Sequence, residues 1–232
     1  MDPPVLKFLS ASIALAMAVV ACSDGSSHAG STPVAGLAST ARAAAATLSS
    51  SVVQVTGTAS QRDQNVDFQI RYTSAAPDRL AYDDQSTLAG KMSRIALVVV
   101  PPKAWTLESG AWTPFTVVDT RTFSADHVWS LVPFDSATLV GTEEVGTTKA
   151  RHYRASLDVQ LPFGELVGTL IASEEASLDG TLDHVDVDYW VDDAHGWPVK
   201  AVYSATGSGK LDLTAELTQA NDPVIAVTPP AS

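Results

Sequence analysis

The chain has 232 residues, with 14 basic and 26 acidic side chains, a formal net charge of -12 and one cysteine. This charge excludes binding to bare nucleic acid, because phosphates require a basic excess, and it argues against docking on anionic lipid head groups, which requires a basic patch. One cysteine excludes an intramolecular disulfide and any cysteine-rich zinc or iron–sulfur site. A hydrophobic fraction of 45% is ordinary for a globular protein. We therefore expect an acidic, disulfide-free globular body without a nucleic-acid partner.

An apolar run, Phe8–Ala21, precedes the cysteine. As a helix it would reach about 21 Å, short of the roughly 30 Å hydrocarbon core, which is typical of a signal peptide over residues 1–21. The run ends in Val19-Val20-Ala21-Cys22, which resembles the bacterial lipobox. That resemblance implies cleavage before Cys22, a diacylglycerol on its thiol and an acyl chain on the new amine, with no other cofactor. The alternative is a small buried residue in an ordinary helix.

A short polar stretch, residues 22–33, follows the apolar run. Its serines, glycines and proline cannot bury enough apolar surface to order it, so we expect a lipidated, flexible tether. Each buried methylene contributes about 0.8 kcal/mol, so two or three acyl chains on Cys22 would hold the protein on a membrane without help from charge. Residues 34–232 are then expected to form one folded domain.

The hydrophobic period changes from helical to strand-like within this domain. Apolar residues at intervals of three or four predict one alanine-rich helix between Val34 and Ser50. Beyond it, apolar and polar side chains alternate strictly in four segments, which predicts half-buried antiparallel strands. These segments are Asn65–Thr73, Arg151–Val159, Asp183–Val191 and Leu211–Thr218.

Shorter strands and two inserted helices complete the predicted domain. The further strands are Ser51–Ala59, Arg79–Asp84, Arg94–Val100, Lys103–Glu108, Ala137–Glu144, Val199–Ala205 and Val224–Val227. The helices are expected at Thr122–Phe134 and Leu161–Ala172. The predicted fold is mainly β (α+β): a single curved antiparallel sheet or half-barrel of about ten or eleven strands, with the N-terminal helix and two short inserted helices on its concave face. Such an arrangement can enclose either a packed core or an apolar cavity.

The order of these features matches a known pattern. The lipobox, tether, alanine-rich helix and long strands are followed by Leu97–Val100 with two tryptophans, by Thr147–Tyr153 after a glycine turn, and by Trp190–Asp193 with Gly196–Lys200. This order resembles the LppX/LprG-type lipoproteins, which share a fold with the LolA/LolB lipoprotein carriers. The resemblance implies a half-barrel around helices, with an apolar cavity that takes acyl chains of a lipid or glycolipid for transport across the envelope, without catalysis.

The same resemblance implies where the protein works and with what. We expect an exported monomer, lipid-anchored on the outer face of the bacterial cytoplasmic membrane or in the cell envelope, whose partners are the lipid cargo, the membrane and a membrane transporter. A rival is an envelope sensor or protein-interaction lipoprotein of the same fold without cargo, favoured by a packed interior and an exposed aromatic patch at Trp190 and Trp197. A structural envelope lipoprotein would show neither cavity nor patch.

Inward apolar side chains are the candidate lipid contacts, although for each of them plain core packing is at least as good an explanation. The candidates are Val53, Val55, Phe68, Ile70, Leu80, Ile95, Leu97, Val99, Trp129, Val132, Leu166, Val187 and Tyr189. They form one hypothesis about one surface.

Nothing in the sequence recommends a catalytic or metal site. The five histidines lack a metal-ligand spacing such as H-E-x-x-H. His184, Asp186 and Asp188 share a strand face about 7 Å apart, but that face is the polar one, which favours a solvated surface. Gly207–Lys210 lacks the glycine spacing of a phosphate loop and predicts a hairpin turn.

Overall fold

The computed structural model describes residues 33–75, 78–108, 110–116, 128–129, 131–132, 134, 136–170 and 178–230. The predicted signal peptide, Cys22 and the tether up to residue 32 lie outside the described residues. Ser31–Ser232 form one compact unit, which contains every strand and both apolar clusters described below. Within the described residues, no helix has the length and hydrophobicity needed to cross a membrane.

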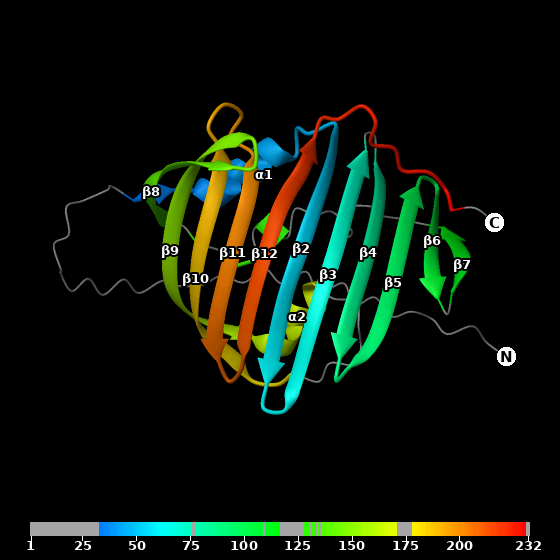
Figure 1. The fold of residues 1–232 in the computed structure, drawn as a ribbon, viewed down its shortest axis with the longest axis horizontal. Helices are drawn as coiled ribbons and strands as arrows, with labels where there is room; N and C mark the ends of the chain where they lie inside the picture. The colour runs from blue at the N-terminus through cyan, green and yellow to red at the C-terminus, as the bar shows by residue number, and fades with distance from the viewer. Residues whose placement is uncertain are drawn as a thin grey trace. The chain divides into compact units, whose positions relative to one another are not determined.

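Twelve antiparallel strands form one curved sheet that does not close on itself (Figure 1). The strands are β1 Val34–Ala35, β2 Ser50–Gln61, β3 Gln64–Ala75, β4 Arg79–Leu88, β5 Lys91–Val100, β6 Lys103–Glu108, β7 Ala111–Thr116, β8 Ser136–Val145, β9 Thr148–Pro162, β10 Thr181–Asp192, β11 Pro198–Gly207 and β12 Lys210–Ala220. Their order is β1-β8-β9-β10-β11-β12-β2-β3-β4-β5-β6-β7, so the last strand pairs with β2 in the middle of the sheet. Two helices are described, α1 Leu37–Ala45 and α2 Phe163–Leu170.

Tight turns make most neighbours in the sheet consecutive in the chain. The turn between β4 and β5 is the clearest case, because Ala89 and Gly90 both have positive φ, of 50° and 78°. Two central residues with positive φ match the right-handed twist of the flanking strands. Nearly all of the sheet therefore forms from local hairpins, and the pairing of β12 with β2 joins its two halves.

The predicted fold class is confirmed, with corrections at its margins. The sheet has twelve strands instead of about ten or eleven, because β1 and the edge strand β7 were not counted. Val224–Val227 is wrong as a strand. It follows a turn in which the amides of Val224 and Ile225 donate to the side chain and the carbonyl of Asp222, and it lies over the outward face of the sheet instead of pairing in it.

The inserted helices are confirmed in part. The Leu161–Ala172 prediction corresponds to α2, although Leu161 and Pro162 end β9 and residues 171–172 lie outside the described residues. Of the predicted Thr122–Phe134 helix, residues 122–127 lie outside the described residues, and Val128–Trp129 form a single 3₁₀ turn. The described residues of this segment form no α-helix, although Val128, Trp129, Val132 and Phe134 are buried.

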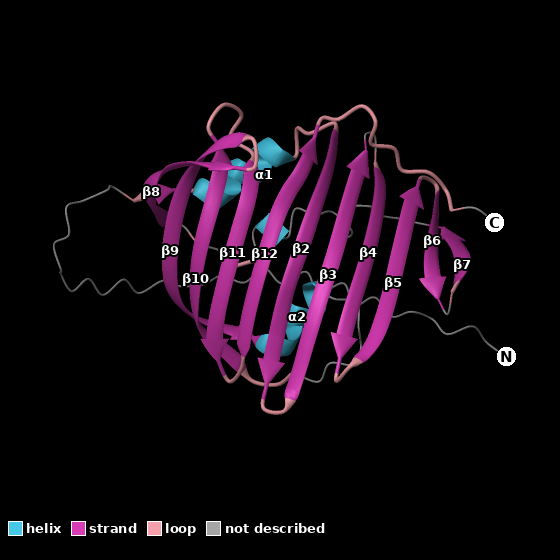
Figure 2. Cartoon of the chain, in the orientation of Figure 1, coloured by secondary structure: helices cyan, strands magenta, loops and turns pink. Residues whose placement is uncertain are grey.

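Alternation gives the sheet an inward and an outward face. Both helices lie on one side, behind the sheet as viewed in Figure 2, and the apolar positions of the long strands point to that side. The main cluster, defined as the buried apolar residues of β2, β3 and β9–β12 with α1, α2 and residues 128–134, fills the space between sheet and helices. A second cluster, Leu80, Leu97, Val99 and Ala104 with Tyr82 and Phe115 packed against it, continues the inward face over β4–β7.

Gly57 marks a close approach within the main cluster, because Phe68 on β3 and Asp212 on β12 leave no room for a side chain. A Cβ atom there would lie 2.5 Å from the Phe68 ζ carbon and 2.6 Å from the Asp212 carbonyl oxygen. We expect Gly57→Ala to lower the free energy of unfolding by about 2 kcal/mol through overpacking, measured by urea denaturation. Gly141→Ala is the control, since none of the described atoms lies within 4 Å of its Cβ position. An equal loss in both variants would contradict the packing explanation.

Candidate functional site

The register of the sheet brings the predicted lipid contacts into cross-strand rows. One row runs Tyr153, Tyr189, Ala201, Ala215, Val55, Ile70, Asp84 and Ile95, from β9 across to β5. A parallel row contains Val187 and Phe68, and a third contains Val53 and Leu97. Strands lie about 4.8 Å apart, so residues distant in the chain form bands on the inward face, which are apolar except where they meet Asp84 and Ser86 on β4.

The thirteen candidates divide between the two clusters. The main cluster contains nine of them: Val53, Val55, Phe68, Ile70, Trp129, Val132, Leu166, Val187 and Tyr189. The second cluster contains Leu80, Leu97 and Val99, whereas Ile95 is half-buried and belongs to neither cluster. All but Ile95 are thus buried. In the main cluster, the six candidates on strands share one apolar core with Leu166 of α2 and with Trp129 and Val132.

The elements packed on the inward face, α1, α2 and the described residues of 128–134, are called the cover. Two tyrosine hydroxyls bond this cover to the sheet. The hydroxyl of Tyr203 on β11 donates to the carbonyl of Val128 at 3.2 Å, and that of Tyr82 on β4 donates to the carbonyl of Leu170 at the end of α2, also at 3.2 Å. Full burial raises the pKa of Tyr203, which keeps its phenol protonated as the donor. The cover is therefore attached by specific hydrogen bonds as well as by apolar contact.

Tyr189 is the exception among the buried phenols. Its side chain is 1% exposed, packs edge-to-face on Phe134 with ring centroids 5.5 Å apart, and has a hydroxyl with no hydrogen-bond partner among the described residues. Burial, and secondarily the nearby Tyr203, raises the pKa of Tyr189. A buried hydroxyl without a partner costs free energy, so the interior holds one polar group that another molecule could satisfy.

Asp84 is a buried carboxylate that was absent from the predicted site. It is 1% exposed and has Ile70 and Ile95 as its neighbours in the row. The pKa of Tyr72 is raised mainly by the burial of Tyr72 itself and secondarily by the charge of Asp84. The signal was present in the sequence, because alternation along β4 places Asp84 on the same face as Leu80. Residue type alone suggested an outward position, since carboxylates are seldom buried.

The pocket that the structure describes lies on the opposite, outward face. It has a volume of about 400 Å³ and lies between residues 222–228 and the ends of β2–β4. The guanidinium of Arg79 holds that segment by donating to the carbonyl of Val227 at 3.3 Å. The pocket is lined by Val52, Arg71, Thr73, Ala81, Gln219, Asp222, Val224, Ile225, Ala226, Val227 and Thr228, and none of the thirteen candidates is among them.

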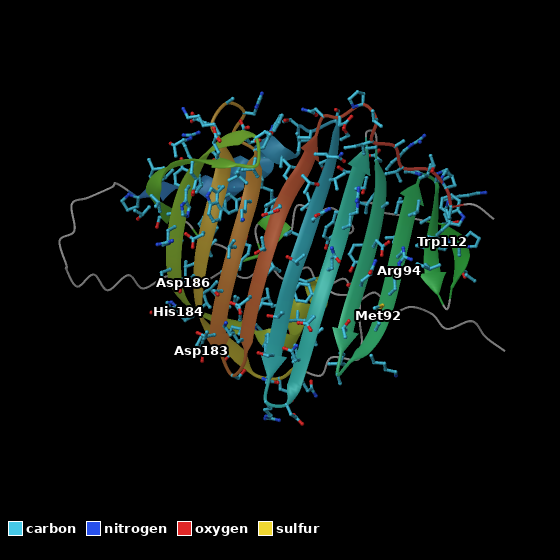
Figure 3. All side chains as sticks on the ribbon, in the orientation of Figure 1. Met92, Arg94, Trp112, Asp183, His184 and Asp186 are labelled. Carbon is cyan, nitrogen blue, oxygen red and sulfur yellow. The ribbon has the colours of Figure 1, made fainter. Side chains whose placement is uncertain are left out.

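His184 lies on the exposed outward face of β10, as Figure 3 shows together with Asp186. Its Nδ1 lies 2.9 Å from Asp158 Oδ1, and its Nε2 lies 3.2 Å from Ser156 Oγ. The order serine, histidine, aspartate is that of a hydrolase triad, but the Ser156 hydroxyl donates to Asp186 at 2.7 Å and the group faces water. A nucleophile engaged in this way, without a water-excluded site, supports no catalytic role. The described residues hold no group that could bind a metal ion.

Trp190 and Trp197 are stacked instead of forming a free patch. Trp190 stacks on His152 with ring centroids 4.3 Å apart and donates from Nε1 to Glu143 at 2.5 Å. His152 in turn contacts Asp188 at 2.6 Å and Glu143 at 2.9 Å. Trp197 stacks on His195, also with ring centroids 4.3 Å apart. Both indoles are half-buried.

Comparisons with known proteins found similar solved structures. No protein-family model and no curated protein matches the chain. The crystal structure of LprF from Mycobacterium bovis is similar over 84% of this chain and 96% of its own, at 14% identity and a TM-score of 0.49. The Mycobacterium tuberculosis lipoprotein LppX is similar over 81% and 96%, at 18% identity and 0.44, and a LolA superfamily protein from Nitrosomonas europaea over 81% and 93%, at 9% and 0.30. The similarity concerns the fold alone, so function has to be argued from the residues of this chain.

The two central tyrosines provide a matched pair of variants. Tyr203→Phe removes the hydrogen bond to Val128 and leaves the Val128 carbonyl without this donor, so we expect it to lower the free energy of unfolding by about 1 kcal/mol. Tyr189→Phe removes a hydroxyl without a partner and is expected to leave stability unchanged or raise it by up to about 1 kcal/mol. Urea denaturation of both measures the difference. Equal losses would show that the Tyr189 hydroxyl is satisfied in solution.

His184 should titrate above an ordinary histidine. Its hydrogen bond to Asp158 is the main cause of the raised pKa, with Asp186 adding to it. The stability it contributes is present below the unfolded-state pKa and is lost as pH rises through the raised folded-state pKa. NMR titration of the imidazole should show a lowered pKa in Asp158→Asn and little change in Asp188→Asn, whose carboxylate contacts His152. An unchanged pKa in Asp158→Asn would contradict the assignment.

Proposed function

We propose that this protein is a non-catalytic, membrane-anchored envelope lipoprotein that binds acyl chains of a lipid or glycolipid against the inward face of its sheet and carries them across the envelope. The observation that carries the proposal is the apolar inward face, which extends from the main cluster into the second cluster and includes one buried carboxylate, Asp84, in the row between Ile70 and Ile95. An antiparallel sheet needs a covered inner face, but it does not need that face to extend over the eleven strands β2–β12.

The second cluster is where we propose that acyl chains first enter. All its members come from β4–β7, and none comes from α1, α2 or residues 128–134. An acyl chain lying there would continue the rows that lead through Ile95 and Asp84 toward Ile70. Each methylene removed from water contributes about 0.8 kcal/mol, so a chain of ordinary length supplies enough free energy to offset movement of a short cover.

The Tyr189 hydroxyl supplies the polar contact of this proposal. It lies in the main cluster, beneath the cover, and lacks a partner among the described residues. A ligand whose ester or hydroxyl oxygen reached it would satisfy a donor that the protein leaves unsatisfied. Displacement of the Val128 and Leu170 contacts would give that ligand access.

Cys22 is proposed as the attachment point to the membrane. The lipobox-like Val19-Val20-Ala21-Cys22 supports cleavage before this residue and its acylation. The body would then work on the outer face of the cytoplasmic membrane or in the cell envelope, as a monomer that receives cargo from a membrane transporter.

A second candidate, a sensor or protein-interaction lipoprotein without cargo, is favoured by one observation. In the described part of the chain the main cluster is packed with the protein's own side chains, and the described pocket lies on the other face. The aromatic patch expected for such a protein is weaker than predicted, because Trp190 and Trp197 are engaged by histidines.

Mass spectrometry of the gently purified full chain distinguishes the two candidates. Under native conditions we expect non-covalent lipid adducts on the carrier, and after denaturation a covalent mass increase on Cys22. The delipidated protein should also take up a fluorescent fatty acid. Absence of both adducts and uptake would overturn the carrier proposal and favour the second candidate, whatever the state of Cys22.

A charge on the inward face should block this uptake. Ile95→Asp places a carboxylate in the apolar row beside Asp84, and we expect at least about a tenfold loss of fatty-acid affinity, because burying an unpaired charge is costly. Met92→Asp makes the same kind of change on the same strand but on the exposed outward face, and should alter affinity less than about twofold. Circular dichroism checks that both variants fold. Equal effects would place the fatty acid elsewhere.

A further inference from the structure

The outward face of β5–β7 is unusual for this sheet because it carries several large apolar side chains beside Arg94 and Lys103. Register and alternation place Val98 and Trp105 opposite each other, with Pro114 next in the row, and Leu107 opposite Trp112 in the adjacent row. Met92 lies farther along β5 on the same face and is 75% exposed (Figure 3). We call Met92, Val98, Trp105, Leu107, Trp112 and Pro114 the tryptophan face; its members are half-buried or exposed.

The side chains of the tryptophan face belong to neither of the two apolar clusters. The inward side chains of the same strands, including Leu97 and Val99, already form the second cluster. From Ala96 to Val100, β5 is therefore apolar on both sides, a pattern expected for a strand covered on both faces. The segment over the neighbouring pocket adds Val224, 83% exposed, so the two most exposed large apolar side chains of the described residues lie on this side of the sheet.

Charge on this half of the outward face is the reverse of that of the whole protein. The outward positions of β3–β7 carry four cations, Arg71, Arg79, Arg94 and Lys103, against two carboxylates, Asp67 and Asp83. Arg94 and Asp83 neutralise each other through bonds of 2.5 and 3.0 Å, which leaves three cations and one carboxylate. The outward positions of β9–β12 carry three cations, Arg154, Lys200 and Lys210, against five carboxylates, Asp158, Asp186, Asp188, Asp212 and Glu216.

We propose that the tryptophan face docks the folded body on an anionic lipid bilayer. Indole rings and an exposed methionine suit the interfacial region of a bilayer, and the surrounding Arg and Lys side chains suit lipid phosphates. A second copy of this chain is disfavoured as the occupant, because two such faces would bring their cations together in a protein whose carboxylates lie elsewhere. Docking in this way needs neither cargo nor acylation of Cys22, so it goes beyond the proposed function.

The test uses residues 31–232, which contain the whole sheet and both clusters but lack the anchor. Co-sedimentation is measured with vesicles of phosphatidylglycerol mixed with phosphatidylcholine and with vesicles of phosphatidylcholine alone. We expect binding to the anionic vesicles, a shift of tryptophan emission to shorter wavelength, and weaker binding at high salt. The double variant Lys103→Glu with Met92→Ser should lose at least about tenfold in affinity.

The control double variant is Lys210→Glu with Val140→Ser, which also reverses one lysine charge and replaces one exposed apolar side chain by serine, on β12 and β8. It should bind the anionic vesicles within about twofold of the unmodified chain. Equal binding to both vesicle types, no binding to either, or equal losses in the two double variants would overturn the proposal. A dimer in solution that only the Lys103/Met92 variant dissociates would also overturn it, because a second copy would then occupy the face.

Discussion

The pleat of an antiparallel strand sends successive side chains to opposite faces, and the rest of this structure depends on that alternation. Because β2, β3 and β9–β12 are apolar at every second position, the sheet has one face that water must not reach. The sheet does not close on itself, so only α1, α2 and residues 128–134 of the described chain can cover that face. Apolar burial and the hydroxyls of Tyr203 and Tyr82 hold this cover in place.

In the proposed carrier, such a cover would link stability to ligand binding. The protein's own side chains and an acyl chain would compete for the space above the sheet, because either of them removes its apolar face from water. Interior polar groups would bias this competition. The hydrogen bond from the Tyr203 hydroxyl to the Val128 carbonyl stabilises the covered state. The Tyr189 hydroxyl, which has no partner among the described residues, would instead stabilise a bound ligand.

Much of the architecture could be predicted because alternation is local. Each long strand shows its inward face in its own residues, which is why nine of the ten predicted contacts that lie on strands are buried on the inner side of the sheet. The prediction of a strand at Val224–Val227 was wrong because this segment is apolar like a strand but pairs with no strand of the described sheet. Asp84 was missed because residue type was weighed above position along β4. Whether the core is filled depends on long-range packing of the cover, which no local pattern contains.

The sequence alone determined the fold class, the inward face and the lipobox-like Cys22, because each is encoded in neighbouring residues. It also supplied a net charge of -12, which argued against contact with anionic lipid. Only the tertiary structure decided where those charges lie. Pairing of distant strands gathers carboxylates on the outward face of β9–β12 and leaves cations and indoles on that of β3–β7. Binding at one surface depends on the charges near it, because salt screens electrostatic interactions beyond about 10 Å. The composition gives only the net charge of the whole chain.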